Sequence, residues 1–223
     1  MKIRFIYANT PFWRAEIGRI ALHLGGVTFE DLRIDREEYS RVRDTGKLDD
    51  GTKIPFRQIP CLNIDGQSIN QTGGISRFCG KLSGLYPNND LVQAALIDQV
   101  IDMATDITNL LGASMREEDE NKKKEIRIQL SKGDLSRKIS FLEELLTENS
   151  WHWMAGNEMS IADIAIWRLM GWLTSGAIDH IPRTLLDPFP NIKNVCKQVN
   201  NHPKIVEWVN MTYPENYSMG NPE

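Results

Sequence analysis

The sequence predicts two parts, a small α/β domain followed by an all-helical domain. Over residues 1–84, short apolar alternations typical of strands are interleaved with helical periodicities. From Leu91 onward the strand signals disappear, and apolar residues recur every three or four positions. The turn-rich stretch 85–90 separates the two patterns, as a linker does. We therefore expect domains at residues 1–84 and 91–223, the second ending in a flexible polar tail after Pro214.

The first domain is expected to combine a βαβ unit with a ββα unit. Alternating apolar residues from Ile3 to Tyr7 predict a strand, and Asn9-Thr10-Pro11 predicts a helix start with a polar cap and a proline at the first helical position. That helix should end at Gly25-Gly26. A second strand at 29–34 should lie parallel to the first, because a helix connects them.

The second half of this domain contains an excursion and a hairpin. Residues 35–54 are charged and turn-rich, which predicts an exposed segment with at most one short helix. Asp65-Gly66 lies between two short apolar runs and predicts a tight hairpin. Asn70-Gln71-Thr72 then opens a helix that ends near Gly84. The element order predicts one mixed sheet with helices on its faces.

The remainder should form a helical bundle. Helices are expected at 91–115, 126–146, 161–172 and 192–208, the last with a break at Pro203. The charge block 117–124 is interpreted as a solvated helix end. Ser160 followed by Asp163 has the form of a capping box, which we interpret as structural.

Composition excludes several classes of function. Of 223 residues, 41% are hydrophobic, and the formal net charge is −4, so neither nucleic acid nor an anionic membrane is favoured. No apolar run approaches the ~20 residues that a membrane helix needs, and no signal peptide is evident. Cys61, Cys79 and Cys196 lack zinc or redox spacing, and the four histidines suggest neither metal nor a triad. We expect buried free thiols, a cytoplasmic location and no metal.

Three places in the first domain could carry chemistry. Tyr7 ends a strand just before a helix start, where it is either a core residue or a neutral hydrogen-bond donor to an anion. At Ile59-Pro60 the backbone could pair with a peptide-like ligand, although the residues alone favour an ordinary trans turn. Thr72 could cap its helix, or its hydroxyl and the free amides could hold a carboxylate. Gly73-Gly74 would be explained by a close ligand or a neighbouring backbone, since each costs roughly 1 kcal/mol in a helix.

In this order and spacing, stretches along nearly the whole chain form a recognisable pattern. They are Tyr7 with Arg14-Ala15-Glu16, and the ranges 55–60, 65–78, 95–98, 159–163 and 190–205. Together they resemble the cytosolic glutathione transferases, especially the tyrosine-type classes alpha, mu, pi and sigma. The resemblance implies a thioredoxin-like first domain, a helical-bundle second domain, and glutathione as co-substrate.

The resemblance implies that Tyr7 is catalytic and donates its hydroxyl hydrogen bond to the sulfur of glutathione. Lowering a thiol pKa of about 8.5 by two units requires about 2.7 kcal/mol. One hydrogen bond to a charged acceptor supplies ~1.5–3 kcal/mol, and a helix N-terminus adds ~0.3–1 kcal/mol. No metal or separate general base is then needed. The thiolate would attack an electrophilic carbon of a hydrophobic second substrate.

The resemblance also implies the binding residues. Ile59 before a cis Pro60 would pair with the cysteinyl backbone, Gln58 would lie near the peptide, and Gln71 and Thr72 would hold the γ-glutamyl group. Asp98 would reach the glutathione bound to the partner subunit, and Phe56 would be an aromatic key in a homodimer. The second substrate would lie between the domains, near Thr10, Thr105, Thr108 and the tail residues Tyr213, Tyr217 and Met219.

Some features depart from the family pattern. The stretch from Tyr7 to Arg14 is one residue longer than usual, so Phe12 or Trp13 either narrows the cleft or packs. The segment 35–53 is also longer and lacks the usual tryptophan, which leaves Lys53 or Lys47 for the glycine carboxylate, with Lys53 preferred. Arg14 is expected to form a structural ion pair rather than to contact the ligand.

Three functional readings remain open at this point. The leading one is a glutathione transferase that acts on hydrophobic electrophiles. A glutathione-dependent isomerase or peroxidase would use the same site, and a non-catalytic structural or adaptor protein would use only the fold. The sequence does not specify the natural electrophile or the transferase class.

Overall fold

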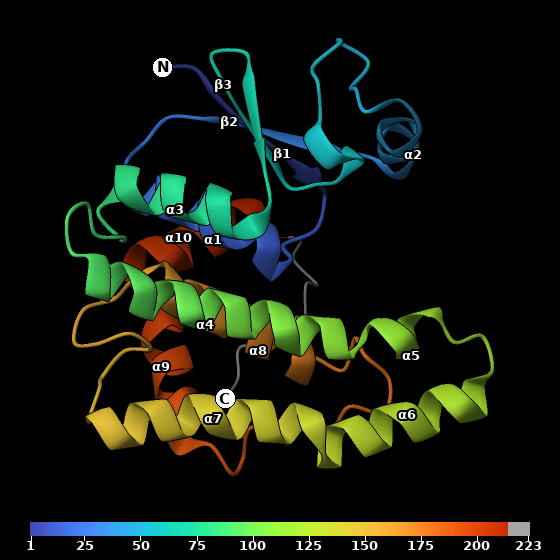
Figure 1. Cartoon of the computed structure of the whole chain (residues 1–223), viewed down its shortest axis with the longest axis vertical. Coiled ribbons are helices and arrows are strands. Elements are labelled where there is room, and N and C mark those ends of the chain that lie inside the picture. Colours follow the sequence, from blue (N-terminus) through green and yellow to red (C-terminus); the bar gives the residue numbers. More distant parts are fainter. Residues whose placement is uncertain (214–223) are drawn as a thin grey trace. The chain divides into compact units, whose positions relative to one another are not determined.

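The computed structural model describes residues 1–213, and the chain divides into two compact units. The first unit comprises residues 1–89, and the second begins at Asp90. Figure 1 shows strands only in the first of these units, among the residues described. The α/β domain followed by an all-helical domain is therefore confirmed as the fold class. Tyr217 and Met219 lie outside the described residues.

A four-stranded mixed sheet forms the first unit, in the order β2-β1-β3-β4. The parallel pairing of β1 with β2 confirms the predicted βαβ unit. β3 runs antiparallel to both β1 and β4. Asp65 and Gly66 connect β3 and β4 with positive φ angles of 48° and 92°, as a tight hairpin requires. The strands are β1 (Ile3–Ala8), β2 (Glu30–Ile34), β3 (Cys61–Ile64) and β4 (Gln67–Asn70).

Two helices, α1 (Trp13–Leu24) and α3 (Thr72–Ser83), pack side by side against one face of this sheet (Figure 1). The approach is close, since a Cβ atom at Gly18 would lie 2.5 Å from the Phe5 ring. The predicted start of the first helix was wrong. Helix α1 begins at Trp13 after Phe12, which provides no side-chain cap.

The other face of the sheet is covered by α2 (Arg36–Thr45) and the segment that follows it. This single helix confirms the expectation for the excursion, and a short 3-10 turn, η1 (Pro55–Arg57), leads into β3. An apolar cluster seals this face, and its buried members are Ile6, Ile34, Val42, Leu48, Ile54 and Cys61. The two faces therefore differ, and only the α1 and α3 side carries the predicted catalytic tyrosine.

The described part of the second unit consists of helices joined by loops, but two helix boundaries differ from expectation. The predicted helix 91–115 divides after Leu110, and the predicted helix 126–146 begins earlier and divides at Gly133, whose backbone is not helical. The break at Pro203 is confirmed. The helices are α4 (Leu91–Leu110), α5 (Gly112–Arg116), α6 (Glu120–Lys132), α7 (Asp134–Asn149), α8 (Ile161–Thr174), α9 (Pro190–Asn200) and α10 (Pro203–Thr212).

The charge block 117–124 forms a solvated helix end, as predicted, because it contains the exposed start of α6. Asp119 caps α6 by accepting hydrogen bonds from the backbone amides of Asn121 and Lys122, so the basic residues lie in the first turns of a helix. No helix within residues 1–213 is both long enough and apolar enough to cross a membrane.

Helix α8 is the centre of the second unit, because every one of its residues is buried. Its start confirms the predicted capping box. The Asp163 carboxylate accepts from the backbone N–H of Ser160 at 2.7 Å and from that of Met154 at 2.7 Å. Ser160 in turn accepts from the Ala162 amide at 3.2 Å. This constellation has the structural role that the sequence indicated.

Candidate active site

Tyr7 lies near the end of β1 and is almost completely buried, with 9% of its surface exposed. Burial raises the pKa of the Tyr7 phenol to about 12, and the positive charges of Arg14 and Arg19 oppose that rise. A phenol with this pKa is protonated at every physiological pH. Tyr7 can therefore donate a hydrogen bond to an anion, which is one of the two alternatives that the sequence left open.

Arg14 connects Tyr7 to the start of α3. Its guanidinium Nη1 donates to the hydroxyl of Thr72 at 3.5 Å, and its charge acts on the Tyr7 phenol. The guanidinium carbon also lies 4.7 Å from the ring centroid of Trp13, which is fully buried and so packs rather than lining a cleft. The expected ion pair is wrong, because Arg14 has no carboxylate partner among the described residues. Its contacts are instead with two of the predicted site residues, Tyr7 and Thr72.

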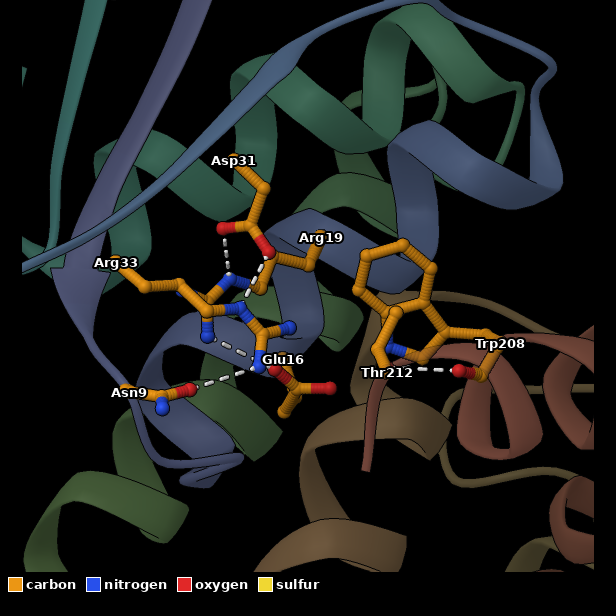
Figure 2. Close-up of polar contacts among 7 residues, drawn as sticks. All are labelled: Asn9, Glu16, Arg19, Asp31, Arg33, Trp208 and Thr212. Carbon is orange, nitrogen blue, oxygen red and sulfur yellow. Dashed lines mark hydrogen bonds and ion pairs between the residues drawn. The ribbon is translucent and has the colours of Figure 1, made fainter. Parts of the chain in front are cut away.

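Figure 2 shows an ionic network that links α1 to β2 and is centred on Arg19. The guanidinium of Arg19 lies over the ring of Tyr7. Arg19 and Glu16 are both fully buried on α1, and the Arg19 Nη1 donates to Glu16 at 3.1 Å. The Arg19 Nε donates to Asp31 of β2 at 2.8 Å, and its guanidinium carbon is 5.7 Å from the Tyr7 ring centroid. Because both charges of the Arg19–Glu16 pair are desolvated, losing one partner would be costly. The network therefore fixes a cation beside the phenol.

The same network extends to the loop between β1 and α1. The second oxygen of the Asp31 carboxylate accepts from the Nε of Arg33 at 2.8 Å. Arg33 Nη1 then donates to the side-chain oxygen of Asn9 at 3.2 Å, as Figure 2 shows. This bond explains why Asn9 does not cap α1. Thr10 lies in this loop, half-buried, with its backbone N–H bonded to the carbonyl of Ala8 at 2.8 Å.

The Ile59-Pro60 peptide bond is cis, as the resemblance implied and contrary to the trans turn that the residues alone favoured. Ile59 is half-buried and packs against the apolar cluster under α2. Its backbone N–H and C=O form no hydrogen bond with any residue in the described part of the chain. Both groups are therefore available to a peptide-like ligand.

The start of α3 lacks a side-chain cap. Gln71 precedes the helix with φ of 74° and ψ of 128°, a strained conformation for a residue with a side chain. Thr72 is the first helical residue and is buried, so the alternative that its hydroxyl caps α3 is wrong. The first amides of the helix therefore stay available for an anion.

Gly73 and Gly74 are not required by the surrounding protein. A Cβ atom at Gly73 would approach only the side chain of Arg77, at 3.8 Å, and one at Gly74 only that of Ile69, at 3.9 Å. Both are ordinary contacts. Of the two explanations that the sequence left open, a neighbouring backbone is excluded and a close ligand is retained.

The remaining predicted residues of the first unit are exposed. Lys53 and Lys47 form an isolated antiparallel bridge, so the two candidates for the glycine carboxylate lie opposite each other. Lys53 also lines a groove of about 600 Å³ with Asn63 and Ser68. That groove lies at the hairpin end of β3, whereas Ile59 precedes the other end of the strand. Gln58 is exposed, and its carbonyl accepts from Asn70.

Three predicted residues lie on α4 of the second unit. Asp98 is half-buried. The hydroxyls of Thr105 and Thr108 donate to the carbonyls of Ile101 and Ala104 one turn earlier, at 3.2 and 2.8 Å. Both threonines lie on one face of the helix, as their spacing predicted, and their roles in binding stay predictions. Tyr213 stacks against the guanidinium of Arg168, 5.2 Å from the ring centroid.

The arrangement favours stabilising an anion. A protonated phenol, the half-buried guanidinium of Arg14 and an open helix start belong to one small domain. Within residues 1–213, no group of three or more His, Cys, Asp or Glu side chains could hold a metal ion. The three cysteines are free and buried, and burial raises the pKa of all three thiols, that of Cys61 to about 11, so none is a ready nucleophile.

Comparison with known proteins gives a consistent result. A family model described as "Glutathione S-transferase, C-terminal domain" matches residues 105–211. Glutathione S-transferase 3 of Caenorhabditis elegans is 27% identical over 87% of this chain and 89% of its own length. Glutathione S-transferase 2 of Manduca sexta is 27% identical over 92% and 93%. The solved structure of prostaglandin synthase D of Nilaparvata lugens is 26% identical, with a TM-score of 0.80 over 96% of this chain and 99% of that one.

Proposed function

The chain belongs to the glutathione transferase family, and from this premise we propose how its site joins glutathione to hydrophobic electrophiles. The observation that carries the proposal is the buried, protonated Tyr7 next to Arg14, whose guanidinium reaches Thr72 at the uncapped start of α3. A donor, a cation and a set of free amides are thus combined in one unit. The thiolate of glutathione is the anion that such a site would stabilise.

Tyr7 donates its hydroxyl hydrogen bond to the thiolate sulfur in this proposal. A hydrogen bond to a charged acceptor is worth about 1.5–3 kcal/mol, which matches the ~2.7 kcal/mol needed to lower a thiol pKa by two units. Arg14 and Arg19 strengthen the donor, because their positive charges favour loss of the phenolic proton. The phenol itself stays protonated, since its pKa of about 12 lies far above neutrality.

The tripeptide backbone is held at two places. The free N–H and C=O of Ile59 pair with the cysteinyl residue, as an added strand would. The γ-glutamyl carboxylate binds the first amides of α3 and the Thr72 hydroxyl, with the Gln71 side chain beside it. Gln58 lies near the peptide, and Lys53 or Lys47 meets the glycine carboxylate. We also propose a cytoplasmic location, which the free buried cysteines support.

We further propose a homodimer in which Phe56 is the contact residue. Phe56 is 71% exposed and has a φ of 57°, so the chain presents a large aromatic ring to solvent in a strained conformation. In a dimer, Asp98 of one subunit would reach the glutathione bound to the other. Phe56→Ala should weaken dimerisation at least tenfold in sedimentation equilibrium. An unchanged dissociation constant would remove Phe56 from this role.

The enzymatic proposal is tested by activity on a panel of electrophiles. Purified protein should be retained on immobilised glutathione and should conjugate glutathione to aryl halides or unsaturated carbonyl compounds. The comparisons favour this function over an isomerase, a peroxidase or a structural protein. Retention without turnover on any electrophile would indicate a binding protein. Loss of both properties would contradict the proposal.

A further inference from the structure

Asn70 is a buried residue that links the two halves of the proposed glutathione site. It is the last residue of β4 and directly precedes Gln71, and only 8% of its surface is exposed. Its side-chain nitrogen donates to the carbonyl of Gln58 at 2.5 Å and to the carbonyl of Pro60 at 3.1 Å. Sequence reasoning treated Asn70 only as part of a helix-opening motif. Its contacts lie ten or more positions away in the chain.

The two carbonyls that Asn70 binds lie on either side of Ile59. The carboxamide therefore uses both of its N–H donors to hold the segment around Ile59, while the backbone N–H and C=O of Ile59 stay unpaired within the described chain. The same residue is covalently joined to the start of α3 through Gln71. The Asn70 side chain thus connects the segment around Ile59 to the start of α3.

We propose that Asn70 is a positioning residue that sets the spacing between the Ile59 backbone and the start of α3, and so determines the affinity for glutathione. This inference rests on the proposed function, in which these two places bind the cysteinyl and γ-glutamyl parts of one ligand. A ligand held at two points binds best when the points are fixed beforehand, because less ordering is required on binding. The role requires no contact between Asn70 and the ligand.

The chemistry of the contact explains why asparagine occupies this position. Two N–H donors on a short neutral group are needed to satisfy two carbonyl acceptors. Aspartate would place an acceptor-only carboxylate against both carbonyl oxygens, and alanine would leave them without a partner. Serine would provide a single donor. Asn70→Ala, Asn70→Asp and Asn70→Ser therefore form a graded series.

Asn63 provides a matched control within the same hairpin. It is also 8% exposed, and its carboxamide forms two hydrogen bonds, to the Ser68 hydroxyl at 2.9 Å and from the Gly66 amide at 3.2 Å. These bonds hold the β3–β4 turn, at the opposite end of the strands from Ile59. Asn63→Ala removes an equally buried carboxamide without touching the segment around Ile59.

The test measures steady-state kinetics and chemical denaturation for both sets of variants. Asn70→Ala should raise the KM for glutathione about tenfold, with kcat and the KM for the electrophile unchanged within twofold. Asn70→Asp should raise the KM for glutathione further, and the KM of Asn70→Ser should lie between those of Asn70→Ala and the wild type. Asn63→Ala and Asn70→Ala should lower the denaturation midpoint by similar amounts. Asn63→Ala should nevertheless leave every kinetic constant unchanged.

The outcomes separate this inference from the proposed function. If wild-type protein binds glutathione and Asn70→Ala has the same KM, the inference is overturned while the proposed function stands. The same conclusion follows if Asn63→Ala raises the KM as much as Asn70→Ala does. If wild-type protein does not bind glutathione, both are overturned. If Asn70→Ala does not fold, the single-donor variant Asn70→Ser decides by the same criterion.

Discussion

Two helices of this chain begin in opposite ways. Helix α8 starts with a buried capping box, in which Ser160 and Asp163 satisfy backbone amides at distances of 2.7 to 3.2 Å. Helix α3 starts after the strained Gln71, has no side-chain cap, and continues with two glycines that no neighbouring atom requires. One helix start is completed by the protein itself, and the other is left open.

The difference shows that the start of α8 contributes to stability, whereas the start of α3 leaves backbone groups available for binding. An N-terminal cap is typically worth about 1 kcal/mol, and each glycine in a helix costs roughly 1 kcal/mol relative to alanine. The start of α3 therefore contributes less to the free energy of unfolding than the start of α8 does. A ligand that bonds to the free amides would recover part of it, which is what the proposed γ-glutamyl site requires.

The largest effect is expected at the capped helix. Asp163→Ala should lower the free energy of unfolding by about 3 kcal/mol, because the buried amides of Met154 and Ser160 lose their acceptor. Urea denaturation measures this loss, and the KM for glutathione of the folded protein should not change. An increase in that KM would show that the α8 cap is not purely structural.

A smaller effect of the opposite kind is expected at the open helix. Thr72→Val removes only the hydroxyl, which does not cap α3, so unfolding should change by no more than about 0.5 kcal/mol while glutathione affinity falls about tenfold. Isothermal titration calorimetry gives the affinity. Ser160→Ala is the control, with about 1 kcal/mol of lost stability and unchanged affinity. The contrast between the two helix starts fails if both variants behave alike.

The smallest effect concerns the glycines. Gly73→Ala should stabilise the ligand-free protein by up to about 1 kcal/mol, since the new methyl group has 3.8 Å of clearance from the nearest side chain. If a ligand lies close to this turn, the same change should weaken glutathione binding several-fold. Thermal denaturation with and without glutathione measures both quantities. Stabilisation with unchanged affinity would mean that no ligand approaches Gly73.

Much of the fold could be predicted because local signals agreed with the tertiary structure. The Asp65-Gly66 turn and the Ser160–Asp163 box can each be recognised from adjacent residues in the sequence, and both form as expected. Helix α1 was misplaced because Asn9 is a good cap by itself, but Arg33 from β2 binds its side chain. The division at Gly133 was missed because apolar periodicity continues across it.

The candidate site was only partly accessible to sequence reasoning. Tyr7 and Thr72 carry residue types that indicate their chemistry, whereas Arg14 and Asn70 act through partners ten or more positions away. Nothing in the local sequence states that a guanidinium will meet a threonine 58 residues later in the chain. A buried polar residue next to a predicted binding residue is the one signal that could have identified Asn70.

The most direct test of the central claim is a pH titration of the thiolate absorbance of bound glutathione, in wild-type protein and in Tyr7→Phe. The wild-type complex should ionise about two pH units below the ~8.5 of a free thiol, and Tyr7→Phe should return the pKa most of the way to that value while still binding glutathione. A bound thiol that titrates near 8.5 in the wild-type complex, or identically in both proteins, would contradict the account.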